Sequence, residues 1–204
     1  MSIQKERTRS GSNTFQLQVS HLSKAFGTEQ VLRDVNLSFS SGNAYCLTAP
    51  SGSGKTTFFR ILMGLETPDS GQIHGLKGKR TAPVFQEDRL LEGFTALQNL
   101  RFVTGRQHST AVLTEALARL LPEDALHKPV REFSGGMKRR VSILRALLAS
   151  SDILIMDEPF TGLDAATKET TAALIREYSR EKLVLFSTHH AEDIELLSAI
   201  RMPL

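Results

Sequence analysis

The sequence has a single cysteine, no tryptophan, and no apolar run close to the roughly 18 residues that a membrane-spanning helix needs. Cys46 therefore has no partner for an internal disulfide, and no group of Cys and His has the spacing of a metal site. Because free cysteines are commonly buried, we expect Cys46 to be a core residue of a strand. These absences argue against a disulfide scaffold, a zinc module and a membrane-spanning protein.

The charges of the chain are nearly balanced, with 25 Lys and Arg against 22 Asp and Glu, a net charge of +3. This excess is too small to indicate a nucleic-acid partner. With 204 residues, of which 40% are hydrophobic, the chain can bury one substantial core, so we expect a single cytoplasmic domain over residues 15–204. Residues 1–14 carry charges but no apolar stretch, and we expect a flexible tail there rather than a secretory signal.

Short apolar segments alternate with helix-like segments along most of the chain. Strands are expected at residues 15–19, 31–39, 44–48, 82–85, 152–156 and 183–187, and helices at residues 55–63, 95–103, 110–121, 135–149, 164–180 and 191–197. Such an alternation is typical of an α/β fold whose parallel sheet is covered on both faces. The middle of the chain lacks strand patterns, which predicts an inserted helical subdomain over about residues 87–149.

A glycine-rich loop of the phosphate-loop (Walker A) type stands between an expected strand and an expected helix. Its glycines let successive N–H groups point at phosphate oxygens, and the helix N-terminus adds the positive end of a dipole. The Lys would reach the β- and γ-phosphates, and the Thr that follows it would coordinate Mg²⁺. If the first position, where the pattern expects Gly, needs a positive φ, its Ala costs about 1 kcal/mol and would slow turnover. The loop reads Ala49-Pro50-Ser51-Gly52-Ser53-Gly54-Lys55-Thr56-Thr57.

An apolar strand ends in two adjacent carboxylates, Asp157 and Glu158. Carboxylates are costly at the end of a buried strand, and a metal-bound nucleotide would explain them. Asp157 would then hold the hydration shell of Mg²⁺, and Glu158 would polarise the attacking water as a general base. Taken alone, a strand that simply emerges into solvent explains the pair equally well.

Ser134, Gly135 and Gly136 stand at the start of an expected helix. Free N–H groups, a hydroxyl and the helix dipole make such a start a ready anion site, although by itself an ordinary N-cap explains the serine better. The basic run 138–140 follows. Because three consecutive residues of a helix point in different directions, we expect a solvated face there rather than a nucleic-acid site.

The order of these motifs resembles that of an ATP-binding cassette (ABC) ATPase from Phe15 to the end of the chain. The resemblance implies an α/β fold of the P-loop NTPase type, with a mostly parallel sheet, an N-terminal antiparallel β part and the helical insert. It also implies ATP and Mg²⁺ as cofactors and head-to-tail pairing with a second copy around two ATP molecules. The motifs that carry the resemblance are the phosphate loop, Gln86, Ser134-Gly135-Gly136, Asp157-Glu158-Pro159, Gly162-Leu163-Asp164 and Ser187-Thr188-His189.

The resemblance also implies a role for each matching residue. Glu158 would be the catalytic base, and His189 would contact the γ-phosphate and the water. Gln86 would contact the Mg²⁺ and the water and would sense the membrane partner, while Phe26 would stack on adenine where Tyr is usual. Residues of the loop 49–57 would bind one ATP. The partner's ATP would be contacted in trans by Ser134, Gly135 and Gly136, and Asp164 would couple the two sites. The Mg²⁺ would be held by Thr56, Gln86 and Asp157, with Asp157 acting through water.

Three classes of ABC protein remain to be weighed: the ATPase of an importer, the ATPase of an exporter, lipoprotein-release or division complex, and a non-transport protein acting on DNA or ribosomes. DNA-handling relatives insert long coiled coils before the Ser-Gly-Gly motif, yet Gln86 and Ser134 lie only 48 positions apart. Translation-type relatives usually carry two cassettes, and this chain has one. The third class is therefore the least favoured, and no nucleic-acid partner is expected.

Local details favour the importer class. Glu158-Pro159-Phe160, Met137 after the glycines, and the segment 86–91 resemble the nitrate, sulfonate and taurine importer branch, although Phe133 replaces the usual Leu. The resemblance implies a subunit on the inner face of the cell membrane that powers separate permease subunits, together with a solute-binding protein. Many importer ATPases continue beyond the helix that follows His189, whereas the chain reaches Leu204 soon after it, so no regulatory domain of that kind is expected.

Overall fold

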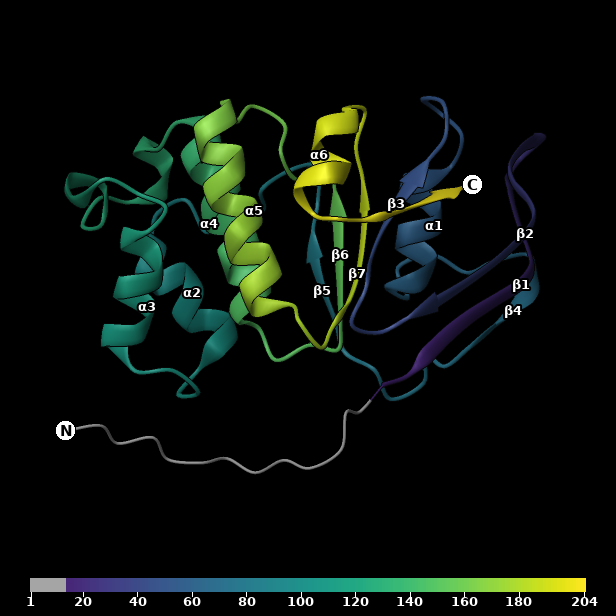
Figure 1. The fold of residues 1–204 in the computed structure, drawn as a ribbon, viewed down its shortest axis with the longest axis horizontal. Coiled ribbons are helices and arrows are strands. Elements are labelled where there is room, and N and C mark those ends of the chain that lie inside the picture. Colours follow the sequence, from purple (N-terminus) through teal and green to yellow (C-terminus); the bar gives the residue numbers. More distant parts are fainter. Residues whose placement is uncertain (1–13) are drawn as a thin grey trace.

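The computed structural model describes residues 14–204, which form two sheets with helices packed around them (Figure 1). The expected tail lies outside these residues except for Thr14. The larger sheet is parallel throughout and has the strand order β5-β6-β7-β3-β8. Its strands are β3 (Ala44–Thr48), β5 (Thr81–Val84), β6 (Ile153–Asp157), β7 (Leu183–Ser187) and β8 (Ile200–Pro203).

The second sheet is antiparallel and has the order β2-β1-β4, which confirms the expected N-terminal antiparallel part. Its strands are β1 (Gln16–Phe26), β2 (Glu29–Ser40) and β4 (Ser70–His74). Leu17 pairs with Phe39, and both side chains are fully buried. β1 continues well past the expected end at residue 19, because its pairing with β2 resumes after a register shift between Val19 and Leu22, where His21 has a φ of 53°.

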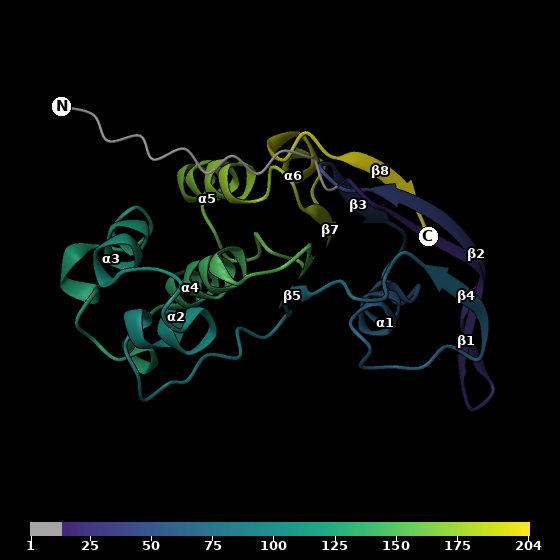
Figure 2. The same cartoon turned by 90° about the horizontal axis from the view of Figure 1, so that it is seen from below.

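Six α-helices are present among the described residues, and in the turned view the parallel sheet lies between α5 and α6 on one side and α1 on the other (Figure 2). Helices α2, α3 and α4 gather at the end of the molecule away from the antiparallel sheet (Figure 1). Short 3-10 turns occupy Glu123–Ala125 and Val130–Glu132. The helices are α1 (Lys55–Leu62), α2 (Ala96–Thr104), α3 (Thr110–Ala118), α4 (Gly135–Leu148), α5 (Ala165–Tyr178) and α6 (Ala191–Leu196).

The central parallel strands β3, β6 and β7 are buried on both faces, so that successive side chains enter two different cores. Leu154 and Met156 of β6 pack in one core with apolar residues of α4, α5 and α6, whereas Ile153 and Ile155 pack in the other with α1 and the antiparallel sheet. Cys46 is fully buried in the first core, as expected, and burial raises the pKa of its thiol to about 11. Among the described residues, none of the helices combines the length and apolarity that a membrane crossing requires.

Candidate functional site

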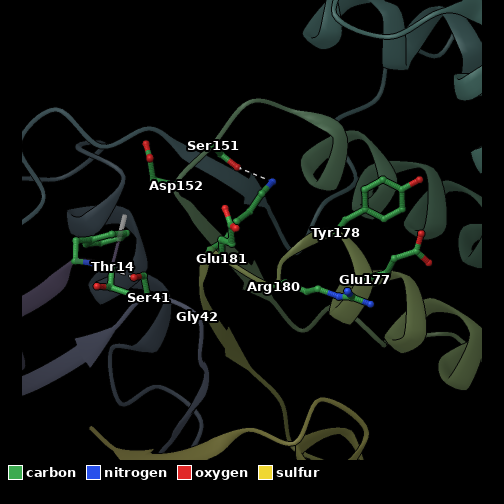
Figure 3. Close-up of a pocket in the computed structure, with 11 residues that line it drawn as sticks. Thr14, Ser41, Gly42, Ser151, Asp152, Glu177, Tyr178, Arg180 and Glu181 are labelled. Carbon is green, nitrogen blue, oxygen red and sulfur yellow. Dashed lines mark hydrogen bonds between the residues drawn. The ribbon is translucent and has the colours of Figure 1, made fainter. Parts of the chain in front are cut away.

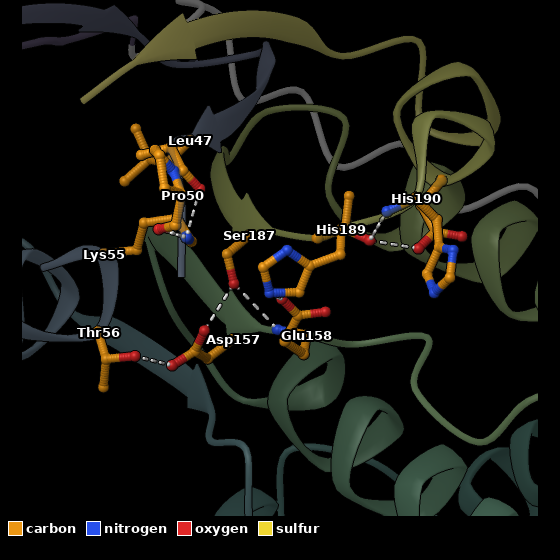
Figure 4. A network of polar contacts seen from close by, with 12 residues as sticks. Leu47, Pro50, Lys55, Thr56, Asp157, Glu158, Ser187, His189 and His190 are labelled. Carbon is orange, nitrogen blue, oxygen red and sulfur yellow. Dashed lines mark hydrogen bonds and ion pairs between the residues drawn. The ribbon is translucent and has the colours of Figure 1, made fainter. Parts of the chain in front are cut away.

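The glycine-rich loop connects β3 to α1 and lies at the carboxyl edge of the parallel sheet. Gly54 begins the helix with a φ of 88°, and a Cβ there would lie 2.8 Å from the Val31 carbonyl and the Leu32 side chain. Only glycine fits this position without strain. The Nζ of Lys55 donates to the carbonyls of Ala49 at 2.7 Å and Pro50 at 2.9 Å, so the ammonium lies across the loop (Figure 4).

Ala49 is not strained. Five non-glycine residues among those described have a positive φ, and Ala49 is not one of them. The cost of a positive φ at this position is therefore absent in this structure.

The acidic end of β6 is joined to the phosphate loop and to β7 by a chain of hydrogen bonds (Figure 4). The Thr56 hydroxyl donates to one carboxylate oxygen of Asp157 at 2.7 Å, and the Ser187 hydroxyl donates to the other at 2.6 Å. The Glu158 N–H donates to the same Ser187 hydroxyl at 3.1 Å. From the sequence, Ser187 is identified only as the first residue of the Ser-Thr-His motif, and its contact with Asp157 is not predicted. The available signal is its position at the end of the expected strand 183–187.

Glu158 and His189 face each other at the end of adjacent strands. The Nε2 of His189 lies 3.2 Å from a carboxylate oxygen of Glu158, and the His189 side chain is 56% exposed. Glu158 has a φ of 51°, a left-handed conformation that costs about 1–2 kcal/mol for a residue with a Cβ. Such a strained residue at the end of a strand is typical of functional sites. The adjacent His190 is exposed.

These side chains line a pocket of about 360 Å³. Phe26 stands at its rim, 48% exposed, with Lys24 Nζ 5.1 Å from the centre of its ring. The pocket therefore combines an accessible aromatic face, a row of loop N–H groups, one ammonium and a carboxylate pair, a set suited to a nucleotide. Its lining residues are Phe26, Val31, Ser51, Gly52, Gly54, Lys55, Thr56, Thr57, Gln86, Asp157, Glu158 and His189.

The donors in this pocket also suit Mg²⁺. The Thr56 hydroxyl and the Asp157 carboxylate converge on each other, and Gln86 lines the same pocket. Among the described residues, no group of three or more His, Cys, Asp and Glu could hold a metal by itself. Mg²⁺ is usually held by one or two protein oxygens together with water and substrate phosphates, and the oxygens of Thr56 and Asp157 are of this kind.

The Ser-Gly-Gly turn lies away from this pocket: none of Ser134, Gly135 and Gly136 is among its lining residues. Ser134 caps α4 and accepts from the Met137 N–H at 3.2 Å. A Cβ at Gly135 would meet open space, whereas a Cβ at Gly136 would lie 3.2 Å from the carbonyl of Gly162. Within one chain, Ser134 and Gly135 are thus exposed and do not line the phosphate-loop pocket.

Asp164 caps α5 and accepts from the Thr167 N–H at 2.8 Å. This hydrogen bond lowers the pKa of the Asp164 carboxyl. The carboxylate is exposed, so it is accessible at the surface while it caps the helix.

The expectation that residues 138–140 form a solvated face is wrong for Arg139, which is buried. Its guanidinium donates to the carbonyls of Phe85, at 2.6 Å, and Gln86. Arg140 is partly buried and donates to the carbonyl of Gly136 at 3.1 Å. The three charged side chains do point in different directions, as their spacing on a helix requires. Arg139 and Arg140, however, point to main-chain carbonyls and not to solvent.

A second pocket, of about 520 Å³, lies at the opposite edge of the parallel sheet, where β3, β6 and β7 begin (Figure 3). Its charged residues are of both signs, among them Asp152, Glu181 and Lys182. Lys182 is used structurally: its Nζ donates to the carbonyl of Leu147 at 2.9 Å, at the end of α4, and to Ser151 at 3.1 Å. None of the predicted site residues lines this pocket, which is larger than the phosphate-loop pocket but lacks its chemistry.

Residues 32–161 match the family described as "ABC transporter". The Nod factor export ATP-binding protein I of Cupriavidus metallidurans is 36% identical over 199 residues, which cover 89% of this chain and 65% of that protein. The aliphatic sulfonates import ATP-binding protein SsuB 1 of Shouchella clausii is 34% identical, with coverage of 89% and 74%. The sulfate/thiosulfate import ATP-binding protein CysA of Synechococcus elongatus is 33% identical, with coverage of 87% and 56%. The chain thus spans less than two thirds of two of these relatives.

Two solved structures are similar to this fold. The dimeric structure of a bacterial ABC transporter cassette superposes with a TM-score of 0.79 at 25% identity, covering 92% of this chain and 94% of that one. A post-hydrolysis state of the same cassette, bound to ADP and phosphate, superposes with a TM-score of 0.75 at 26% identity, covering 88% and 90%.

Proposed function

Because the chain belongs to the ABC transporter family, we propose that it is the ATP-binding and ATP-hydrolysing subunit of a transporter. The observation that carries this proposal is the convergence, at the end of three parallel strands, of Lys55, Thr56, Asp157, Glu158 and His189. A phosphate loop, a carboxylate for a metal, a carboxylate for water and a histidine beside it are the parts that ATP hydrolysis requires.

In the proposed mechanism, the loop N–H groups and Lys55 bind the phosphates, with the ammonium moving from the Ala49 and Pro50 carbonyls to the more negative phosphate oxygens. Thr56, Asp157 and Gln86 would hold Mg²⁺, which neutralises developing negative charge when bound. Glu158 orients the attacking water and accepts its proton. His189, at 3.2 Å from Glu158, fixes the carboxylate and is placed to contact the γ-phosphate.

We propose that two copies pair head to tail, so that Ser134, Gly135 and Gly136 close on the partner's ATP and Asp164 couples the two sites. The exposure of this turn, its absence from its own phosphate pocket and the open space around Gly135 support an action in trans. A similar cassette has been solved as a dimer. In this proposal residues of about 87–149 form a helical subdomain that carries the Ser-Gly-Gly turn.

We propose that integral membrane permease subunits dock beside the Gln86 loop, which would place the chain at the cytoplasmic face of the membrane. Four apolar residues in this region are more than 40% exposed: Leu91, Phe94, Phe102 and Val103. The rings of Phe94 and Phe102 meet edge to face with centroids 5.3 Å apart. An exposed aromatic patch of this kind is typical of a surface that a partner covers.

Uptake of a small solute, assisted by a solute-binding protein, is the direction of transport that we propose. The sulfonate and sulfate import relatives support it, as does the likeness of Glu158-Pro159-Phe160 to importer sequences. Export is the second candidate, because the Nod factor export protein is 36% identical, against 34% and 33% for the import relatives.

The proposal is tested by comparing ATP binding and hydrolysis in the parent chain and two variants. Glu158→Gln should bind ATP, dimerise and hydrolyse at least about a hundredfold more slowly, because the base is lost while the phosphate contacts remain. Lys55→Ala should lose ATP binding. Unchanged turnover in the first variant, or unchanged affinity in the second, would contradict the assigned roles.

The permease proposal has its own test. Tagged protein is purified from detergent-solubilised membranes and the bound proteins are identified by mass spectrometry. A multi-span permease should copurify with the parent chain and be lost with Phe102→Asp, while the control Val112→Asp, an exposed apolar residue of α3, should retain it. Recovery of ribosomal or DNA-repair proteins with no permease would refute a transport role.

A further inference from the structure

Helix α4 holds the segment that carries Gln86 through four main-chain carbonyls. Arg139 donates to the carbonyls of Phe85, at 2.6 Å, and of Gln86. Arg145 donates to the carbonyls of Arg89, at 2.7 Å, and of Asp88, at 3.2 Å. Two arginines of a single helix therefore fix the path of the loop that follows β5.

Arg139 is the stronger of the two attachments because it also pairs with a side chain of the loop. Its Nε lies 3.3 Å from Asp88 Oδ1, and the two side chains are only 8% and 20% exposed. Burial raises the pKa of the Asp88 carboxyl, and the charge of Arg139 acts against this rise. A buried guanidinium is costly without its acceptors, so the loop and the helix are stable as a unit and not as separate parts.

The position of Arg139 connects two motifs that serve different sites. It is the fifth residue of α4, three residues after Gly136, while Gln86 lines the pocket that holds Lys55 and Glu158. The planar guanidinium makes its bonds in a fixed geometry, so a displacement of this end of α4 would pull on the Gln86 main chain.

We propose that Arg139 is a positioning residue that makes Gln86 follow the N-terminal turn of α4. The inference rests on the proposed function: when Ser134–Gly136 close on the nucleotide of a partner copy, α4 shifts, and Arg139 carries this shift to Gln86 in its own pocket. Without Arg139 the nucleotide still binds and the dimer still closes, but Gln86 is not brought to its working position and hydrolysis falls.

The absence of tryptophan from the sequence allows a direct test. Phe85→Trp introduces a single fluorescent reporter into the loop, at a half-buried ring that lies 3.7 Å from the Arg89 guanidinium. In a Glu158→Gln background, ATP and Mg²⁺ are added, dimer formation is followed by light scattering, and the emission of the reporter is recorded. The reporter should respond to ATP when Arg139 is present and lose this response with Arg139→Met, although the dimer still forms.

A matched control is the neighbouring cation Lys138, whose Nζ pairs with Glu92 at 2.9 Å and does not reach the Gln86 carbonyl. Lys138→Met should leave the reporter response intact. Should Arg139→Met fail to fold, Arg139→Gln serves in its place, because its amide can donate to one of the two carbonyls and should retain part of the response.

In the chain with Glu158 intact, Arg139→Met should lower kcat between about tenfold and a hundredfold, as expected for a misplaced group, with ATP affinity within about twofold of the parent. A purely structural role would lower the thermal midpoint and leave the reporter response of the folded fraction unchanged. That unchanged response would overturn the inference. Failure of the parent chain to bind ATP or to dimerise would instead overturn the proposed function, and the inference with it.

Discussion

The hydroxyl of Thr56 donates to a carboxylate oxygen of Asp157 at 2.7 Å, although 101 positions separate the two residues in the chain. The contact exists because β3 and β6 run parallel in one sheet, with β7 between them, so that the turns at their carboxyl ends meet. Ser187, at the end of β7, completes the connection through the other oxygen of Asp157. The site is therefore held together by the sheet rather than by its own loops.

Ser187→Ala tests this arrangement. The substitution removes the donor to Asp157 and the acceptor for the Glu158 N–H in a fully buried position, which should lower the free energy of unfolding by about 1–3 kcal/mol. Hydrolysis should fall as well, because neither carboxylate stays oriented. Urea unfolding and steady-state ATPase measurements check both effects.

The control for this variant is Ser142→Ala. Ser142 lies in α4, is equally buried, and has no hydrogen-bond partner for its hydroxyl among the described residues. Replacing it removes an unsatisfied polar atom, so stability should stay constant or rise. If both substitutions destabilise the protein equally, the hydrogen bonds of Ser187 are not what holds the site.

The two glycines of the Ser-Gly-Gly turn should respond differently to alanine. In Gly135→Ala the Cβ meets open space and the helix gains up to about 1 kcal/mol from propensity, so the nucleotide-free chain should be more stable. In Gly136→Ala the Cβ lies 3.2 Å from the Gly162 carbonyl, and this crowding should offset the gain. Urea unfolding without nucleotide gives the order of stability.

ATPase measurements on the same two variants should show whether the turn acts on a partner's nucleotide or only affects the stability of its own chain. If residue 135 faces the phosphates of a partner, Gly135→Ala should reduce hydrolysis and ATP-dependent dimerisation while raising stability. Full activity in this variant would contradict the action of the turn in trans.

The secondary structure that depends on local pattern was predictable from the sequence. The apolar runs 44–48 and 183–187 are β3 and β7 with the expected bounds, and Ser134 caps α4 as its position before the helix indicated. β8 was not predicted, because its four residues include Arg201 and Pro203 and are too few to give a strand pattern. This strand exists through its pairing with β3, a long-range contact that no local pattern encodes.

The same distinction applies to the site. The motifs located Lys55, Asp157 and Glu158, since each stands at the end of an element that the sequence itself defines. Arg139 was interpreted as a solvated charge, because the acceptors that bury it lie more than 50 positions earlier in the chain. Roles that depend on a contact between distant segments require the fold.

The buried thiol of Cys46 predicts a pH effect on stability. Burial raises the pKa of this thiol from its ordinary value of 9.0 to about 11, so between these values the folded state keeps a proton that the unfolded state has lost. Stability should therefore fall as the pH rises from 8 to 10, with about 1 kcal/mol of the loss due to Cys46. In urea unfolding, Cys46→Ala should show a smaller loss by that amount; an equal loss would mean that the thiol does not titrate as inferred.

Ala49 and Gly54 lie in the phosphate loop, and the exchange of glycine and alanine should have different effects at these two positions. Gly54 has a φ of 88°, and a Cβ there would lie 2.8 Å from the Val31 carbonyl, so Gly54→Ala should destabilise the chain by more than about 1 kcal/mol and weaken ATP binding.

Ala49→Gly restores the residue that the phosphate-loop pattern expects, yet it should not improve the enzyme. Ala49 has no positive φ, so glycine relieves no strain and adds only conformational freedom to the unfolded chain. The free energy of unfolding should fall by about 0.4–1 kcal/mol, and kcat should not rise. Because the Lys55 ammonium binds the carbonyl of residue 49 and not its side chain, the nucleotide-free position of Lys55 should also be retained. A higher kcat in Ala49→Gly would mean that the loop must pass through a positive φ at this residue during turnover.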